Sequence, residues 1–189
     1  MNAVLKAIAE RRCVRKYESR PVPRDMIEAV IIAGNQAPSA MNSQPWRFVV
    51  IDDPDFRNRL VSAAVSQADN FLEPLKVNHP ERYGLIRKRF EELTDPIYYS
   101  APVVVFVIGS GPFADMSCPL ACENMMLAAH SLGLGSCWVH FGSFAAADPE
   151  IKAALDLSPE EKIYGPLIFG YAQGYPEPPT KKPPVVKWI

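Results

Sequence analysis

The chain contains 189 residues, of which 48% are hydrophobic and 22% are charged, and its formal net charge at pH 7 is −1. This length suits a single domain with a sizeable buried core. The near balance of 20 Lys and Arg against 21 Asp and Glu argues against a partner that is nucleic acid or an anionic membrane, so any anion site must be local.

Targeting and redox signals point to the cell interior. The longest apolar run, residues 103–108, is too short to cross a bilayer, and the N-terminal residues lack the continuous apolar core of a signal peptide. The four cysteines, Cys13, Cys118, Cys122 and Cys137, form no CxxC pair of the metal-binding type. We therefore expect a reduced, cytoplasmic protein with no metal site and no membrane partner.

Apolar periodicity and turn signals predict helices and strands in an irregular order. The expected helices cover residues 3–11, 24–36, 55–66, 82–92, 116–132 and 147–154. The expected strands cover residues 47–51, 103–108, 136–141 and 167–171, with 185–188 in the tail as a further candidate. Because two helical stretches precede the first strand, this order favours a layered α+β domain over a doubly wound nucleotide-binding fold.

One expected helix is unusually apolar. Between Leu120 and Leu134 the only charged side chain is that of Glu123, and Ala, Met and Leu dominate the rest. A helix that is apolar nearly all round is buried on all sides. A chain of this size achieves such burial most easily in a dimer, so this helix is a first indication of a homodimer.

The sequence contains no self-sufficient active site. It lacks a GxSxG elbow, an HExxH pair and a GxxxxGK[ST] loop, and its histidines, His79, His130 and His140, are scattered. A catalytic triad requires partners within hydrogen-bond reach. We therefore assign no catalytic side chain and expect any chemistry to come from a cofactor.

The first candidate site is the basic segment RRCVRKY at residues 11–17, where the first helix ends. Its cations would complement the negative end of the helix dipole, and read alone the segment is best explained as a solvated helix cap. The alternative is that Arg12 and Arg15, on either side of Cys13, turn their guanidinium groups toward a phosphate or the polar edge of a planar ring.

The second candidate is the polar loop APSAMNSQPWR at residues 37–47. Its prolines restrict the backbone, and it presents the hydroxyl of Ser39 with the amides of Asn42 and Gln44. Each amide offers a donor and an acceptor, which suits the pyrimidine edge of a flavin or a base. The alternative is an ordinary loop between a helix and a strand.

Two weaker candidates follow. In GLGSCW at residues 133–138, glycines precede a strand and would let the backbone approach a ligand, although Gly133 is also explained as a helix stop. In the tail, Lys181 and Lys182 lie among prolines that make the segment stiff and extended, and there they either bind an anion or keep the tail soluble. The apolar tail end, residues 185–189, favours docking on a surface.

Taken together and in this order, the four motifs resemble those of the nitroreductase-like FMN family. The resemblance runs from about residue 8 to the C-terminus and is poorest over residues 66–98. It implies an α+β fold with a mixed central sheet flanked by helices, in an intertwined homodimer with two FMN sites at its interface. It also implies a domain over residues 1–176 and an extension, residues 177–189, that packs on the partner subunit.

The resemblance implies a function and a set of cofactor contacts. The family carries hydride from NAD(P)H through flavin to a nitroaromatic, a quinone or another electron-poor acceptor. By position, Arg11 and Lys181 or Lys182 match phosphate-binding residues, Arg12 and Cys13 lie beside them, and Arg15 matches the cation near the flavin ring. The remaining expected contacts are Pro38, Ser39, Asn42 and Gln44 from the other subunit, and Ser136, Cys137 and Trp138 along the ring.

This sequence departs from the family pattern at several positions. Cys13 stands where the family commonly has Ser, and the tail has two lysines where a Lys/Arg mix is usual. Gly142 lies where some members have an acidic residue, so a contact to flavin N5 would come from the backbone.

The acceptor groove is expected around Phe71, Tyr83 and Phe90. The open alternatives are a dehalogenation, a flavin fragmentation, a non-catalytic FMN-binding protein and a dimer without cofactor.

Overall fold

The most apolar stretch of the chain forms the central strand of the sheet, β2 (Val103–Gly109), in a computed structural model that describes residues 2–189 except the side chain of Asp69. The sheet order is β1-β2-β5-β3, and β4 pairs with β2 beside this path. The other strands are β1 (Trp46–Ile51), β3 (Gly135–Trp138), β4 (Lys162–Ile163) and β5 (Leu167–Gly170).

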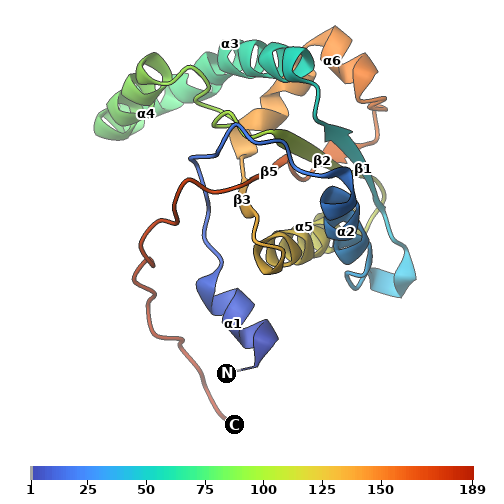
Figure 1. The fold of residues 1–189 in the computed structure, drawn as a ribbon. Coiled ribbons are helices and arrows are strands. Elements are labelled where there is room, and N and C mark those ends of the chain that lie inside the picture. The colour runs from blue at the N-terminus through green and yellow to red at the C-terminus, as the bar shows by residue number, and fades with distance from the viewer. Residues whose placement is uncertain (1) are drawn as a thin grey trace.

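Helices cover both faces of this sheet (Figure 1). One face packs against α2 (Arg24–Asn35) and α5 (Ala114–Ser131). The other packs against α3 (Pro54–Asn78), the 3-10 segment η2 (His140–Ala147) and α6 (Pro149–Ala154). Two further helices lie outside these layers: α4 (Pro80–Glu92) continues from α3, and α1 (Ala3–Glu10) lies beside the C-terminal segment.

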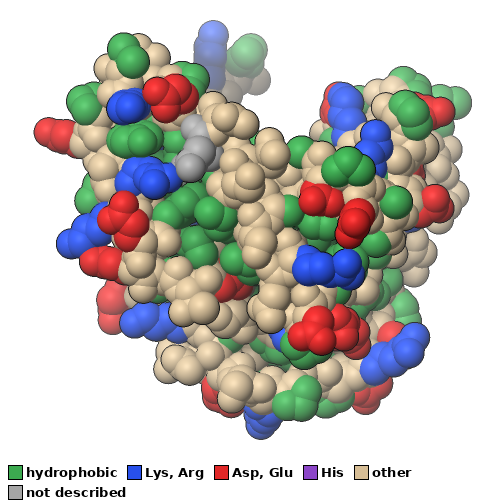
Figure 2. Space-filling view, turned by 90° about the horizontal axis from the view of Figure 1, so that it is seen from above, with side chains coloured by type: hydrophobic (Ala, Val, Ile, Leu, Met, Phe, Trp, Pro, Cys, Tyr) green, Lys and Arg blue, Asp and Glu red, His purple; other side chains and the backbone are tan. Residues whose placement is uncertain are grey.

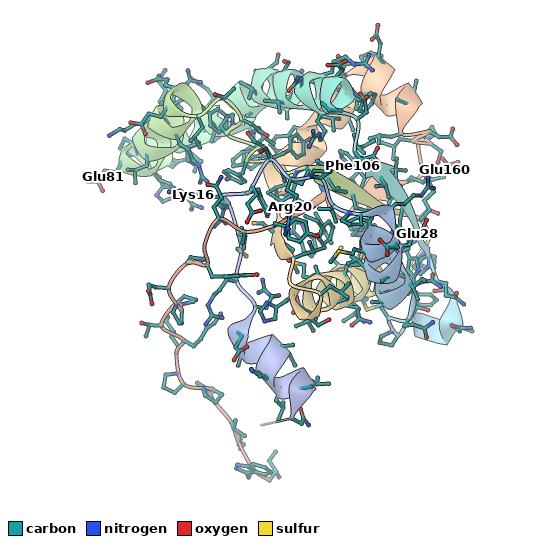
Figure 3. All side chains as sticks on the ribbon, viewed as in Figure 1. Lys16, Arg20, Glu28, Glu81, Phe106 and Glu160 are labelled. Atoms are coloured by element: carbon teal, nitrogen blue, oxygen red, sulfur yellow. The ribbon has the colours of Figure 1, made fainter. Side chains whose placement is uncertain are left out.

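Strand β2 explains the layering, because successive side chains of a strand point to opposite faces. Val103, Val105 and Val107 join the core with α2 and α5, whereas Val104, Phe106 and Ile108 join the core with α3 and η2. Figure 3 shows Phe106 inside the molecule. A strand buried on both faces reads as a continuous apolar run, which is the pattern that predicted it.

Several sequence-based predictions about the sheet were wrong. All pairings between the named strands are antiparallel, so the sheet is not mixed in this chain. Strand β3 ends at Trp138, Val139 precedes η2, and His140 and Phe141 begin η2 instead. Residues 185–188 form no strand: the tail pairs with no described strand, and an isolated extended segment has no ladder to join.

The third helix is much longer than the predicted 55–66. Leu60, Ala64, Ala68 and Leu72 are buried at four-residue spacing, so one apolar stripe continues to Leu72 in a helix that ends at Asn78. This stripe packs on η2 and closes the second face of the sheet. Figure 2 views the molecule from the side of α3, α4 and α6, where acidic and basic side chains are interspersed.

The proline-rich C-terminal segment runs beside α1 (Figure 1), and Ile8 and Ala9 share a hollow with Pro176, Pro178 and Pro179. The side chain of Trp188 is 92% exposed, and Val185, Val186 and Ile189 are exposed with it. Docking of this apolar end therefore does not occur within the single chain. Among helices of residues 2–189, none has the length and hydrophobicity required to span a bilayer.

An arginine on β1 fastens the sheet to the loop after α6. The Nε and Nη2 atoms of Arg47 donate to Glu161 at 2.6 and 2.8 Å, and its Nη1 and Nη2 atoms donate to the carbonyls of Leu155 and Asp156 at 3.0 and 2.7 Å. Ser158 N–H also donates to Glu161 at 3.0 Å. These bonds lower the pKa of Glu161 from 4.5 to about 2, with the Arg47 contact as the largest cause.

We expect Glu161→Gln to lower the free energy of unfolding at pH 7 by about 1–2 kcal/mol, because the charge-assisted pair is lost. Since the folded-state pKa of Glu161 is depressed, its contribution is complete above pH 4.5 and disappears as the pH falls toward 2. Urea unfolding at pH 7 and pH 3 measures both effects. Glu160→Gln on the same exposed loop is the control, and equal losses in the two variants would contradict the assignment.

Candidate functional site

The basic segment is held between the sheet and the start of the tail. Helix α1 ends at Glu10, and the chain then runs extended. Val14 N–H donates to the carbonyl of Ser136 at 2.9 Å, and Cys13 and Ser136 form a parallel bridge. Farther along, Tyr17 bridges Ala172. The segment is thus fastened at both ends, which fixes where its side chains point.

A groove opens between this segment and the tail, and we call it the terminal groove. Its volume is about 680 Å³. It contains four cationic side chains, those of Arg11, Arg12, Arg15 and Lys181, and one carboxylate, that of Glu177. The rest of its lining is Ile8, Ala9, Cys13, Pro176, Pro178 and Pro179. A net positive, half-enclosed groove of this kind is suited to an anion.

A second cavity of about 470 Å³ continues from the terminal groove and shares Cys13, Arg15 and Pro176 with it. Lys16 also lines it, and Figure 3 shows Lys16 where the basic segment crosses the tail. Gln173 N–H donates to the carbonyl of Lys16 at 3.1 Å and fixes this crossing. The two hollows together form one continuous surface beside the basic segment.

The cations of the groove differ in what they already contact. Arg12 donates from Nη1 to the carbonyls of Ala9 and Arg11 at 2.7 and 2.8 Å, so its side chain caps the end of α1, as the helix-cap interpretation predicts. Arg11 has a loose ion pair with Glu123 at 3.9 Å. Arg15 lies over the ring of Tyr99 at 5.9 Å from its centroid. Arg11 and Arg15 are therefore the better placed of these arginines for a ligand.

Cys13 and Cys137 meet at the floor of the groove. The pKa of Cys13 is lowered from 9.0 to about 5, first by a hydrogen bond with Cys137 and then, against burial, by Arg11 and Arg15. Its sulfur lies 3.8 Å from Nη1 of Arg11. The pKa of Cys137 is raised, because its proton is shared with Cys13 and its environment is buried. Cys13 is thus the more acidic thiol of the pair. The Sγ atom of Cys137 donates to the carbonyl of Trp138 at 3.5 Å.

Cys118 and Cys122 behave differently, since burial raises the pKa of these core thiols to about 11 and about 12. Both lie in the core between α5 and the sheet, as the sequence predicts. Among residues 2–189, no group of His, Cys, Asp and Glu has a metal-binding arrangement. The reactive sulfur of this chain is therefore that of Cys13.

Next to this pair, the Oγ atom of Ser136 is buried and has no hydrogen-bond partner among the described residues. Ser136 is 1% exposed, while its carbonyl accepts from Val14. Buried hydroxyls are normally hydrogen-bonded, and leaving one unpaired is costly. This unpaired hydroxyl lies at the joint between β3 and the basic segment.

The polar loop lies elsewhere in the chain, beyond α2 and at the start of β1 (Figure 1). It forms the short 3-10 segment η1 (Ala40–Asn42), and its own side chains hold it: Gln44 N–H donates to Ser39 Oγ at 3.0 Å and Gln44 Nε2 to Asn42 Oδ1 at 3.1 Å. Neither Pro38 nor these residues line the terminal groove. A single chain therefore does not bring the polar loop and the basic segment together.

The structure also separates the remaining predicted residues. Lys181 lines the terminal groove, and Lys182 does not. Trp138 ends β3 and packs against the core on the α2 and α5 side. At Gly142, the N–H donates to Val139 and the carbonyl accepts from Tyr98 Oη at 2.7 Å. The predicted backbone contact from Gly142 therefore lacks a free backbone group.

An aromatic cluster lies between α3, α4 and η2. Phe71 lies 5.0 Å from Phe144 and 5.7 Å from Phe141 between ring centroids, and Phe90 lies 6.2 Å from Phe141. Phe71 and Phe90 were predicted for the acceptor groove, whereas Tyr83 lies outside these ring pairs. Phe141 and Phe144 were missed because residues 136–141 were assigned to a strand. Their spacing of three residues is the signal that favours a helical turn.

Comparisons with known proteins agree with the α+β fold of this chain. The sequence model of the Nitroreductase family matches residues 8–171. A putative NADH dehydrogenase/NAD(P)H nitroreductase of Methanothermobacter thermautotrophicus is 35% identical over 71% of this chain, and the match spans 59% of that protein. An iodotyrosine deiodinase of Thermotoga neapolitana is 29% identical over 93% of this chain and 89% of its own length. A Bacteroides fragilis nitroreductase crystallised with FMN superposes with a TM-score of 0.78 at 30% identity over 100% of both chains.

We expect Gly135→Ala to displace the basic segment from β3. A Cβ atom at Gly135 would lie 2.8 Å from Cγ2 and 2.9 Å from Cβ of Val14, closer than real contacts allow. The predicted loss of unfolding free energy is about 1–3 kcal/mol, as for other overpacked sites. Denaturant unfolding measures it, with Gly84→Ala as control because nothing lies within 4 Å of that position. A Gly135→Ala protein as stable as the control would refute the close packing.

Proposed function

The chain belongs to the nitroreductase family, and on this basis we propose that it is an oxidoreductase that holds FMN in the terminal groove and uses NAD(P)H to reduce an electron-poor acceptor. Nitroaromatics and quinones are the acceptor classes we propose. The observation that carries the proposal is the gathering of Arg11, Arg15 and Lys181 around one groove that is fastened to β3.

The residues of the groove fit the phosphate end of FMN. Guanidinium and ammonium groups bind phosphate oxygens by charge-assisted hydrogen bonds, and Arg11 and Lys181 are placed to supply them. The buried hydroxyl of Ser136 supplies a further donor. Lys182 is one residue farther along the tail and is the alternative cation. Arg12 would act through its backbone, since its guanidinium already caps α1.

The bound flavin would supply hydride transfer, and the protein's part is to orient the ring and to compensate its charge. Arg15 carries the positive charge that would oppose the negative charge of a reduced ring. Tyr99 keeps Arg15 in place from one side, and Arg89 lies over the same ring at 4.5 Å. The aromatic cluster of Phe71, Phe141 and Phe144 offers ring faces and edges to a flat acceptor and keeps water away.

A second copy of the chain would complete the site. Pro38, Ser39, Asn42 and Gln44 are too far from the terminal groove of their own chain, and we propose that they reach the FMN of the partner. The exposed tail end at Trp188 and the exposed apolar residues of α1, Val4, Leu5 and Ile8, would be covered in the same assembly. We propose a cytoplasmic homodimer with residues 1–176 as the FMN-binding domain and residues 177–189 packed on the partner.

A second candidate reaction is reductive removal of a halogen from an aromatic ring. It is favoured by the deiodinase of Thermotoga neapolitana, whose alignment covers 93% of this chain, including the aromatic cluster. The same groove would serve both reactions, and the acceptor would differ. Nothing in the terminal groove distinguishes NADH from NADPH.

We expect the purified protein to bind FMN with the yellow absorption of a flavin and to lose this absorption on anaerobic mixing with NADH or NADPH. Re-oxidation is then measured with a nitroaromatic, a quinone, an iodinated phenol and free flavin. Faster re-oxidation by the iodinated phenol would favour dehalogenation. If the flavin stays oxidised with both nicotinamides, the protein binds FMN but is not an NAD(P)H-dependent oxidoreductase. If the protein does not bind FMN, the proposal is refuted.

We expect Arg15→Ala and the double change of Lys181 and Lys182 to Ala each to weaken FMN binding about 10- to 100-fold, the loss of a charged hydrogen bond. Fluorescence titration of flavin measures the affinity. Arg24→Ala and Lys187→Ala are the controls, because both residues are exposed and lie outside the groove. If the controls and the test variants retain FMN equally, the cofactor site has been misplaced.

A further inference from the structure

Cys13 lines the cationic terminal groove together with Arg11, Arg12 and Arg15. Its sulfur is 3.8 Å from Nη1 of Arg11, and Arg15 adds positive charge from two residues further along. Cys137 lies beside it on β3, and its own Sγ donates to the carbonyl of Trp138 at 3.5 Å. A thiolate in such surroundings is the stable form of Cys13 at neutral pH.

The charged and titratable groups around this sulfur come from every neighbouring element. Positive charge comes from Arg11, Arg12 and Arg15 on its own segment and from Lys181 on the tail. Negative charge comes from Glu177 on the tail and from Glu123 on α5, which is 3.9 Å from Arg11. Tyr17 and Tyr99 are neutral, since burial raises the pKa of both phenols.

The environment of Ser136 indicates independently that an acceptor group belongs here. Its Oγ atom is buried without a partner, although its residue is bridged to Cys13. The nearby sulfur therefore does not satisfy this donor. A ligand anion that enters the terminal groove is attracted by the same cations as the sulfur. The thiolate and such a ligand would compete for the same positive charges.

We propose that Cys13 holds the arginines of the terminal groove as a thiolate in the cofactor-free chain, and that binding of a flavin phosphate returns a proton to this sulfur. The inference rests on the proposed function, because it takes the phosphate of FMN as the competing anion. The proton comes from solvent and forms the S–H bond of Cys13, and no electron is transferred. The hydrogen of Cys137 is already directed at the carbonyl of Trp138, which lies 3.5 Å from its sulfur, and takes no part in this exchange.

The direction of the linkage follows from the charges. The pKa of Cys13 is about 5 without ligand, and a phosphate beside it disfavours the thiolate and raises that pKa. Between the two values, FMN affinity falls by about tenfold for each unit of rising pH, since each binding event must take up a proton. Measurements at pH 8 avoid the second ionisation of the phosphate itself, which lies near pH 6.

Calorimetric titration of the full chain with FMN at pH 8, in buffers of different ionisation enthalpy, gives the number of protons exchanged. We expect an uptake approaching one proton with FMN and none with riboflavin, which lacks the phosphate. Cys13→Ser is expected to abolish the uptake and to bind FMN at least tenfold more tightly at this pH, whereas Cys118→Ala is expected to keep the uptake. Equal uptake in wild type and Cys13→Ser would overturn the proposal.

Alkylation by iodoacetamide separates this proposal from the proposed function. In the cofactor-free chain, the rate of Cys13 modification should rise with a midpoint near pH 5, and saturating inorganic phosphate should shift that midpoint upward. A shift without any FMN binding would refute the FMN site and support competition between anion and thiolate. A midpoint near the ordinary value of 9.0, or one that phosphate leaves unchanged, would overturn the inference.

Discussion

The site depends on one short joint, the backbone contact between Val14 and Ser136. It attaches a segment that follows the first helix to a strand more than half the chain away, and the second bridge, at Tyr17 and Ala172, attaches the same segment to the start of the tail. The two contacts divide the side chains of this extended segment. Val14 and Tyr17 enter the core, whereas Arg15 between them lines the terminal groove.

Four cations in one groove repel each other, and the fold tolerates them because the three arginines each have a partial compensation. Arg12 binds helix carbonyls, Arg11 approaches both a carboxylate and a sulfur, and Arg15 lies over an aromatic ring. None of these partners is as strong as a bidentate carboxylate such as Glu161 offers to Arg47. Arg47 thus forms a structural ion pair, whereas Arg11, Arg12 and Arg15 form a cluster that can still bind a ligand. Binding of that ligand would also stabilise the fold.

Local sequence patterns predicted the helix and sheet layers. They failed to predict features that depend on contacts between segments far apart in the chain. The continuous apolar run of β2 and the basic segment that follows α1 are visible in consecutive residues. The four-residue spacing from Leu60 to Leu72 also indicates the length of α3. Two of the four buried positions are alanines, so the apolar pattern in the sequence is weak there. The contact between Cys13 and Cys137 and the unpaired hydroxyl of Ser136 exist only after β3 meets the basic segment, so no local pattern could show them. The strand predicted at 185–188 failed because a strand requires a neighbour.

The central position of β2 has a consequence for biosynthesis. Its sequence, VVVFVIG, combines β-branched residues with the absence of charge, which is the composition of segments that aggregate when exposed. One neighbour, β1, is made before it, but β5 lies far downstream, at Leu167–Gly170. During synthesis one edge of β2 therefore stays unpaired until nearly the whole chain has left the ribosome. Chaperone cover during that interval, rather than the stability of the finished fold, would then limit the yield of this protein.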